Sequence, residues 1–248
     1  MVSGDVESQT PLIGQRGQLV TKDIEVDIRR DFILKVYGIL ATQIILTVLV
    51  ALPFVLVDAV QTFVRDNSGL IGFVTILSVF GFLITFSLKP ESIKTHPYGL
   101  LTLFGFTVVE GVFIGTLCVF LTPSSVLFTV GVCVVIVGSL TAWAVFAKAD
   151  FTGYAPFVYV AGLVFVLFLI AGLLLMPFLP GVSVFNMVIS ALLVLFFSAY
   201  LVIDTQAILG GQHKYQFTVD DYVFAALAIY LDIVNMLIQL LSAFGQRK

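Results

Sequence analysis

Apolar residues in this chain gather into seven blocks of about 20 residues, and short polar segments separate each block from the next. A helix rises about 1.5 Å per residue, so a block of this length can cross a hydrocarbon core of about 30 Å. The pattern therefore predicts an all-α fold, a polytopic membrane bundle of seven transmembrane helices. The predicted spans are 32–57, 70–88, 99–121, 126–147, 155–176, 185–204 and 222–244.

The first 31 residues are polar, and no apolar run begins before Phe32. This pattern excludes a cleaved signal peptide and predicts two parts, a disordered cytosolic tail (1–31) and a seven-span membrane domain (32–248). Within the tail, the sequence ESQTPLI from Glu7 to Ile13 has the form of an acidic dileucine sorting signal. Such signals are found in endosomal, lysosomal and vacuolar membrane proteins.

Composition excludes several classes of protein. Hydrophobic residues make up 60% of the chain and charged residues 11%, against about 25% charged residues in soluble domains. The lipid bilayer is therefore the expected surrounding of most of the chain. A net charge of −3 without a basic stripe excludes a nucleic-acid binder. Cys118 and Cys133 lie in apolar runs without metal-ligand spacing, which favours buried, inert thiols over a zinc site or a disulfide.

Lysine and arginine predict the orientation, because cytosolic loops retain them. Nine lie on the side of the N-terminus and three on the other side, so we expect a cytosolic N-terminus and a lumenal or external C-terminus. The nine are Arg16, Lys22, Arg29, Arg30, Lys35, Lys89, Lys94, Lys148 and Lys214, and the three are Arg65, Arg247 and Lys248. A last block that dips in and returns would change the split to eleven against one, so the charges leave the seventh crossing open.

Three acids lie inside predicted spans, Glu110, Asp204 and Asp232, and no lysine or arginine lies deep in any span. A carboxylate at the bilayer centre costs about 2.5–3.5 kcal/mol on insertion scales, so these residues are candidates for function. Asp232 lies about 15 Å into the last span, close to the midplane. Asn235 and Gln239 share its helical face and extend a polar stripe along this helix.

A second polar stripe on the sixth span contains Asp204, Tyr200 and Asn186. The sixth and seventh spans are consecutive and antiparallel, so facing stripes would bring Asp204 and Asp232 into one cavity. Asp204 lies only about 5–8 Å from its helix end, so helix tilt, a kink or a bridging water must make up the difference in depth.

Glu110 lies in the middle of the third span, beside Gly111 and Gly115. The two glycines form a small-xxx-small pattern, which predicts close helix packing, while Glu110 is expected to face the interior as supporting pore lining. Two interpretations of the three acids stay open. They either hydrogen-bond neighbouring helices as structural links, or they admit a cation. Oxygen ligands suit calcium or protons better than soft metals, which makes Asp204 and Asp232 candidate calcium ligands.

Several motifs resemble the Bax-inhibitor motif family, particularly its Lifeguard branch. The strongest is DDYVFAALAIYLDIVN at residues 220–235, which is similar to the last-span signature of that family. IDTQAILG at 203–210, GFTVVEG at 105–111 and KADFT at 148–152 resemble its sixth span, third span and fourth loop. The resemblance covers nearly all of the chain after about Arg29.

This resemblance implies a calcium-leak channel that lowers stored calcium and restrains cell death, with calcium as the transported ion and no cofactor. It implies that Asp204 and Asp232 form a pH-sensing pair that gates the pore. Some members of the family add a basic latch from the second span, for which the nearest base here is Lys89, at the boundary of its span. The expected location is the endoplasmic reticulum, the Golgi or an endolysosomal or vacuolar membrane, and death-regulating membrane proteins are expected partners.

Two other functions remain as alternatives. Intramembrane aspartyl proteases also use two aspartates on consecutive spans, but this chain has Ile203 before Asp204 and lacks their Pro-Ala-Leu motif, so we expect no enzyme. A non-conducting protein that binds cell-death regulators would have the same composition. It would protect cells equally well after both aspartates were neutralised.

Overall fold

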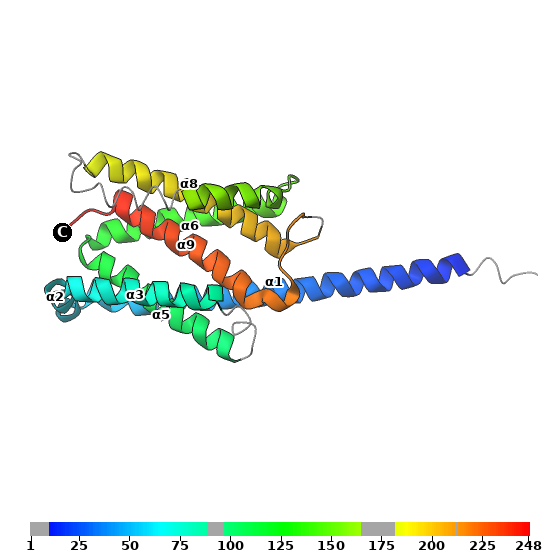
Figure 1. Cartoon of the computed structure of the whole chain (residues 1–248), viewed down its shortest axis with the longest axis horizontal. Helices are drawn as coiled ribbons and strands as arrows, with labels where there is room; N and C mark the ends of the chain where they lie inside the picture. The colour runs from blue at the N-terminus through cyan, green and yellow to red at the C-terminus, as the bar shows by residue number, and fades with distance from the viewer. Residues whose placement is uncertain (1–9, 89–96, 165–181, 212) are drawn as a thin grey trace, which may run out of the picture.

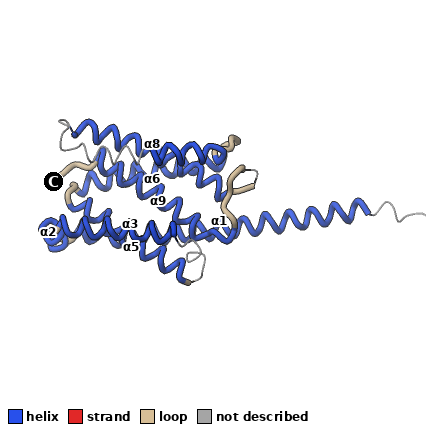
Figure 2. The backbone as a smooth tube through the Cα atoms, in the orientation of Figure 1, coloured by secondary structure: helices blue, strands red, loops and turns tan. Residues whose placement is uncertain are grey.

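The computed structural model describes residues 10–88, 97–164, 182–211 and 213–248, and for residues 10–23, 83, 87 and 182–186 it describes the backbone only. The described part is built from helices, and the extended pairing in it is one isolated bridge between Leu121 and Arg247 (Figure 2). This confirms the all-α prediction for the described residues. The helices are α1 (Thr10–Leu56), α2 (Asp58–Asp66), α3 (Ser68–Leu88), α5 (Tyr98–Val119), α6 (Pro123–Phe146), α8 (Val182–Leu209) and α9 (Tyr222–Phe244), with 3-10 turns η1 (Thr152–Tyr154) and η3 (Val219–Asp221).

Six of the helical segments are long and apolar enough to cross a membrane. The fifth predicted span, 155–176, starts inside a shorter apolar helix, Thr152–Val164, and continues outside the described residues. The predicted count of seven spans therefore stays a prediction, and the described residues support six.

The first helix differs most from its predicted bounds. The sequence favours a disordered tail up to residue 31, whereas α1 runs without a break from Thr10 to Leu56. Hydropathy shows where a helix enters the membrane, but a helix can begin earlier in polar sequence, because Glu, Lys and Arg are good helix formers in water. In Figure 1 this first part of α1 projects beyond the rest of the bundle.

Breaks between helices fall where the chain carries residues that end helices. Pro97 precedes the first residue of α5, and Pro123 is the first residue of α6, a position at which proline costs no hydrogen bond. Gly245 ends α9. These residues divide one long apolar sequence into separate crossings.

α9 is the central helix of the bundle. It packs against α8, α1, α6 and α5, and it is the most buried of the six apolar helices. Figure 1 shows α9 running obliquely between α6 and α8 on one side and α1, α3 and α5 on the other. Tyr230 on α9 is fully buried, and its ring packs edge-on against Phe106 of α5 with centroids 6.3 Å apart. Asp232, two residues further along α9, is also buried, so its carboxyl group lies in the interior of the bundle.

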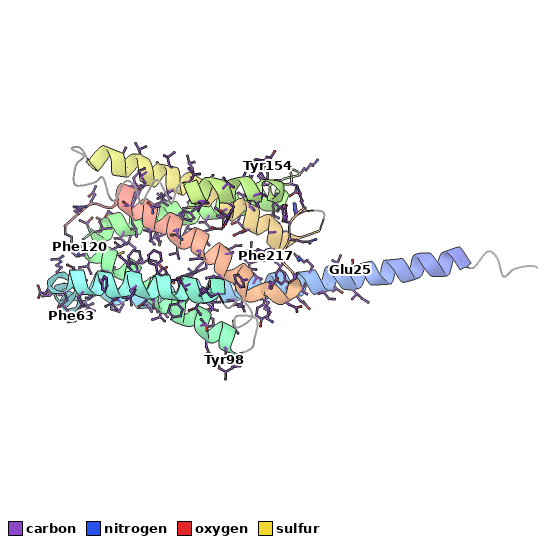
Figure 3. All side chains as sticks on the ribbon, viewed as in Figure 1. Glu25, Phe63, Tyr98, Phe120, Tyr154 and Phe217 are labelled. Carbon is purple, nitrogen blue, oxygen red and sulfur yellow. The ribbon has the colours of Figure 1, made fainter. Side chains whose placement is uncertain are left out.

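Large apolar side chains cover the outside of the bundle, as expected for a surface in contact with lipid chains. Figure 3 shows Tyr98 and Tyr154 projecting from the bundle, and both are more than half exposed. The same figure places Phe63 and Phe120 near one end of the bundle and Glu25 and Phe217 near the other. The C-terminus lies at the end where α2 lies, opposite the projecting part of α1 (Figure 1).

Candidate functional site

The two candidate aspartates lie on α8 and α9, which share the most extensive contact of any two described helices. The chain reverses between them through residues 210–221. Gly210 and Gly211 begin this reversal with φ of +65° and +81°, a region that glycine adopts without strain. The antiparallel pair predicted from consecutive spans is therefore present.

Arg29 of α1 holds the start of this reversal in place. Its guanidinium group donates hydrogen bonds to the carbonyl oxygens of Ala207 at 2.6 Å, Leu209 at 3.2 Å and Phe217 at 2.7 Å. The last carbonyls of a helix have no partner within the helix, so a planar cation with several donors is well suited to this position. Arg29 thereby fixes the end of the helix that carries Asp204.

Asp150 holds the other side of the same loop. Its carboxylate accepts hydrogen bonds from the Thr152 hydroxyl at 2.6 Å and the Lys214 backbone N–H at 2.9 Å, and it lies 3.2 Å from His213 Nδ1. The hydroxyl of Thr152, together with the Lys214 N–H, lowers the pKa of Asp150 to about 2. The KADFT motif therefore contributes structure here, because its aspartate ties two loops together.

Gln206 completes this connection from inside α8. Its Oε1 accepts the backbone N–H of Phe151 at 2.7 Å, and its Nε2 donates to the Ala149 carbonyl at 2.9 Å. Gln206 is fully buried and lies two residues after Asp204. The loop after α6 is thus fixed to the helix turn that carries the first aspartate.

The side chains of Asp204 and Asp232 hydrogen-bond each other. Asp232 is 5% exposed, Asp204 is partly buried, and Oδ2 of Asp232 has no hydrogen-bond partner. Two carboxyl groups can share a hydrogen bond only when one of them carries a proton. The pair is therefore a buried centre in which the two helices can share a proton.

The predicted mismatch in depth is resolved by the helices themselves. α8 continues five residues past Asp204 to Leu209, beyond the predicted end of the sixth span, so Asp204 lies more than one turn inside its helix. α9 also crosses the bundle obliquely (Figure 1). No bridging group is needed to join the two carboxyls.

Tyr200 is the nearest of the predicted supporting residues. It is close enough to both aspartates to interact with them electrostatically, and its ring packs against Phe196. Asn235 donates its amide to the Leu231 carbonyl one turn earlier on α9, at 2.8 Å. Gln239 lies two turns beyond Asp232 and lines a cavity of about 590 Å³ near the C-terminus, together with Ser242.

Two further predicted residues fall outside what can be tested. Lys89, the candidate latch, lies outside the described residues, and Asn186 lies on α8 with its side chain outside them. Within the described ranges, the ion pair present is that of His213 with Asp150, so no described base neutralises the aspartates. No group of three or more His, Cys, Asp or Glu side chains that could hold a metal occurs there either.

Glu110 belongs to a different part of the interior. It interacts with Tyr230 of α9, whereas Asp232 interacts with Asp204. Tyr230 and Asp232 are two residues apart on one helix, about 200° around its axis, so they point to nearly opposite sides. The structure thus joins the two aspartates and separates Glu110 from them.

Sequence reasoning missed the residues that position this site. Arg29 was counted only as a cytosolic charge, and Gln43 and Thr47 of α1 were not considered at all, although both are buried. Their spacing of four residues within an apolar block places them on one face of a helix. That spacing was the signal available in the sequence.

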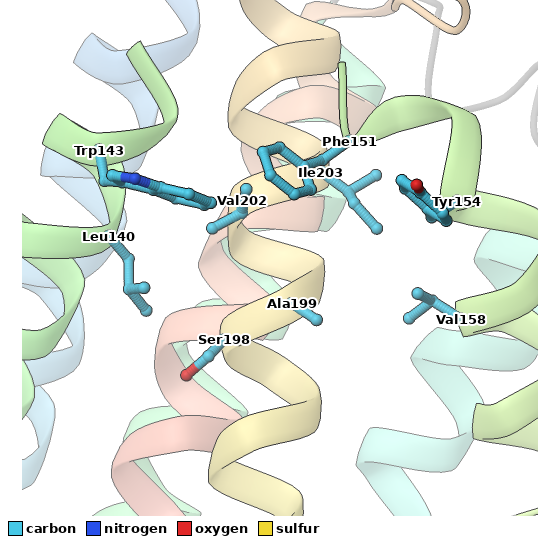
Figure 4. Close-up of a pocket in the computed structure, with 9 residues that line it drawn as sticks. All are labelled: Leu140, Trp143, Phe151, Tyr154, Val158, Ser198, Ala199, Val202 and Ile203. Atoms are coloured by element: carbon cyan, nitrogen blue, oxygen red, sulfur yellow. The ribbon is translucent and has the colours of Figure 1, made fainter. Parts of the chain in front are cut away.

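An apolar cavity of about 490 Å³ lies beside α8 without including either aspartate (Figure 4). It opens between α6, α8 and the helix Thr152–Val164. Its lining residues are Leu140, Trp143, Phe151, Tyr154, Val158, Ser198, Ala199, Val202 and Ile203. Because almost all of these groups are apolar, the cavity offers no site for an ion.

Comparison with known proteins identifies the family. Residues 29–248 match the family described as inhibitor of apoptosis-promoting Bax1. The chain is 30% identical to Protein lifeguard 4 of Mus musculus over 217 residues, which cover 88% of this chain and 85% of the relative. It is 30% identical to Protein LIFEGUARD 4 of Arabidopsis thaliana, with 93% and 91% covered, and 29% identical to Protein lifeguard 3 of Homo sapiens, with 89% and 70% covered. The chain therefore belongs to the Bax-inhibitor family of apoptosis-regulating membrane proteins, in its Lifeguard branch.

Proposed function

We propose that this protein is a calcium-leak channel of an internal or surface membrane, such as the endoplasmic reticulum, the Golgi or an endolysosomal membrane. Its leak lowers stored calcium and thereby restrains apoptosis. The observation that carries the proposal is the buried, hydrogen-bonded pair of Asp204 and Asp232 in the central helix contact. The channel crosses the membrane seven times, with its N-terminus in the cytosol.

The charge of the pair suits a passing divalent cation. With no described base beside them, two ionised carboxylates carry two negative charges, which one calcium ion balances. Calcium takes six to eight oxygen ligands, and the described residues supply no larger acidic cluster, so water must complete the shell. A site with few protein ligands binds calcium weakly, which suits conduction better than storage.

The same pair can close the pore when it is protonated. With a shared proton, the carboxyl groups hold α8 and α9 together. Without it, two negative charges face each other in a poorly solvated position, repel, and attract calcium. Deprotonation therefore opens the path, and protons compete with calcium for one site.

The test is calcium flux into liposomes that contain the purified chain. Wild type is compared with Asp232→Asn and with the double variant Asp204→Asn, Asp232→Asn. Asp220→Asn serves as the matched control, because Asp220 is exposed just before α9. We expect flux to fall or lose its regulation in both variants of the aspartate pair and to stay unchanged in the control. Equal flux from wild type and the double variant would contradict the proposal that Asp204 and Asp232 lie on the calcium path.

A non-conducting interaction protein is distinguished by cell survival. If the protein acts only by binding death regulators, the double variant protects cells as well as wild type does. If it acts through the leak, protection is lost together with flux. Intact folding of each variant is checked by its thermal midpoint in detergent.

A further inference from the structure

α9 separates two polar centres. One is the aspartate pair on the side of α8. The other lies on the side of α1 and α5 and consists of Gln43, Thr47, Thr107, Glu110 and Tyr230, which we call the Glu110 centre. Tyr230, Gln43 and Thr107 are fully buried, and Glu110 is 5% exposed.

Hydrogen bonds connect four members of the Glu110 centre across three helices, and Glu110 interacts electrostatically with Tyr230. Gln43 Nε2 of α1 donates to Thr107 Oγ1 of α5 at 3.1 Å. The hydroxyl groups of Thr47 on α1 and Tyr230 on α9 lie 2.8 Å apart. Tyr230 also interacts with Thr107 and Glu110 of α5. The five side chains therefore form one connected group in the interior of the bundle.

The hydroxyl hydrogens of this group are already used. Thr107 donates to the Leu103 carbonyl at 2.9 Å, and Thr47 donates to the Gln43 carbonyl at 2.8 Å. A hydroxyl group has one hydrogen, so the bond between Tyr230 and Thr47 must use the hydrogen of Tyr230. No hydroxyl donor is then left for the remaining acceptors.

Two buried oxygen atoms have no partner as a result, Oε1 of Gln43 and Oε2 of Glu110. A buried acceptor without a partner costs about 1–3 kcal/mol, and an unpaired charge costs more. Buried acceptors that no hydroxyl group can supply with a hydrogen are an environment that a positive charge prefers. The centre therefore lacks a cation rather than another hydrogen-bonding side chain.

No described basic residue supplies that charge. Lys35, the closest lysine before Gln43 on α1, lies eight residues or about 12 Å earlier, and its ammonium group sits 3.4 Å from the centre of the Tyr222 ring. From α3, Phe82 and Phe86 pack against Phe106 of α5. Besides Glu110, the titratable member of the group is Tyr230.

The number of charged groups in the Glu110 centre indicates which class of ligand it can bind. The Glu110 centre has one carboxylate among neutral oxygens, so one singly charged cation makes it neutral, whereas a divalent ion would leave a buried surplus charge. We propose that the Glu110 centre is a binding site for one singly charged cation, a sodium ion or a proton, separate from the calcium path at Asp204 and Asp232. Its occupant joins α1, α5 and α9 by replacing the missing donor.

The experiment uses the purified full chain in detergent at pH 8 and measures its thermal midpoint. Sodium chloride is titrated against choline chloride at constant ionic strength, for wild type, Glu110→Gln and the double variant Asp204→Asn, Asp232→Asn. If sodium is the occupant, it raises the midpoint of wild type and of the double variant by about 5–10 °C at about one hundred times its Kd. It has no such effect on Glu110→Gln, which keeps the shape but not the charge.

If the occupant is a proton, infrared spectroscopy detects it as a carboxylic acid carbonyl band. The band persists in the Asp204→Asn, Asp232→Asn variant and disappears when Glu110→Gln is added. Because the aspartates are absent from this background, the result does not depend on the proposed calcium leak. Gln43→Leu provides a second variant if Glu110→Gln does not fold, and we expect it to weaken sodium binding or to shift the carbonyl band.

Two results would overturn the proposal. The first is that neither a sodium effect nor the carbonyl band is found, because Glu110 would then be ionised without a partner. The second is a calcium effect that needs Glu110 and that sodium does not reproduce, which would contradict the count of charges. Loss of calcium flux in the aspartate variants tests the channel alone and leaves both readouts of the Glu110 centre intact.

Discussion

At the scale of single residues, Arg29 joins the start of the membrane domain to the loop that separates the two aspartates. Its three carbonyl partners all belong to the end of α8 or the segment that follows. Hydrogen bonds from a charged donor contribute about 1.5–3 kcal/mol each. A residue that contacts neither aspartate thus determines where the helix of Asp204 ends.

The two glycines of the reversal give a matched test of this clamp. Both have positive φ, so alanine costs about 1–2 kcal/mol at either position. A Cβ at Gly210 would also lie 2.5 Å from Arg29 Cζ, whereas at Gly211 nothing lies within 4 Å. The guanidinium can move aside only by giving up its carbonyl partners. We expect Gly210→Ala to lower the free energy of unfolding by about 2 kcal/mol more than Gly211→Ala.

Thermal unfolding in detergent measures this difference as a midpoint about 4–8 °C lower for Gly210→Ala. Arg29→Ala is the control for the cause. In that background the two glycine variants should become equal. A difference that persists without Arg29 would assign the effect to the backbone instead.

The sequence revealed the acids of the site more easily than their surroundings. Asp204, Asp232 and Glu110 stand out because charge is rare in apolar spans. Gln43 and Arg29 do not, since a neutral amide and a cytosolic arginine have common explanations. Which acid faces which is set by helix rotation, so sequence spacing could favour the pairing of Asp204 with Asp232 but could not separate Glu110 from them.

At the scale of helices, the contact between α1 and α5 depends on two glycines. A Cβ at Gly111 would meet Val50 at 2.9 Å, and one at Gly115 would meet the Phe54 ring at 2.7 Å. This confirms the packing interpretation of the small-xxx-small pattern. The close approach also holds α1 and α5 in position around Glu110.

We expect Gly115→Ala to destabilise the protein by about 1–3 kcal/mol, because the added methyl group overpacks a tight contact. Gly138 of α6 is the matched control, since nothing lies within 4 Å of a Cβ there. Gly138→Ala should be neutral or stabilising by about 0.5–1 kcal/mol, as alanine favours helix. Equal thermal midpoints for the two variants would contradict the role of Gly115 in packing.

Helix bounds were predictable where polar residues or glycine directly flank an apolar run. The predicted last span, 222–244, agrees with α9 at both ends, where Asp221 and Gly245 flank the apolar run. The start of α1 was not predictable, because it depends on helix propensity in water and not on hydropathy. The end of α8 was placed five residues early for a related reason, since the polar side chains of Thr205 and Gln206 are buried by partners far away in sequence.

At the scale of the whole molecule, the two termini of the membrane domain lie at opposite ends of the bundle (Figure 1). α9 has 23 residues, about 35 Å of helix, and its end pairs with the start of α6 through Thr122 N–H and the Gln246 carbonyl at 2.8 Å. α9 is therefore long enough to cross the membrane, and a full last crossing stays a prediction.

We expect a tag before Met1 to be digested by protease added to intact organelles or sealed vesicles with their cytosolic face outward, and a tag after Lys248 to be protected. Detergent should make both tags accessible, which is the control for sealing. Digestion of both tags without detergent would show that α9 does not cross. The proposed pore would then have to be lined by helices other than α9.

The loops that contain Asp150 and His213 should keep their arrangement while the aspartates titrate. The hydrogen bonds of Asp150 lower its pKa to about 2, so its stabilising effect is present above its ordinary pKa and is lost only as the pH falls toward 2. Asp150 therefore keeps its charge from pH 5 to pH 8. His213 faces it, with Nδ1 3.2 Å from the Asp150 carboxylate. Replacing His213 therefore serves as the control for replacing one of the aspartates.

We expect calcium flux in liposomes to rise from pH 5 to pH 8, with the aspartate pair as the sensor. At low pH a shared proton lets Asp204 and Asp232 hold α8 and α9 together. At high pH its loss leaves two charges that repel each other and attract calcium. Asp204→Asn removes the repulsion and should shift the midpoint of the profile, whereas His213→Gln should leave it in place. A flat wild-type profile, or a midpoint that moves with His213 and not with Asp204, would remove the pair as the sensor.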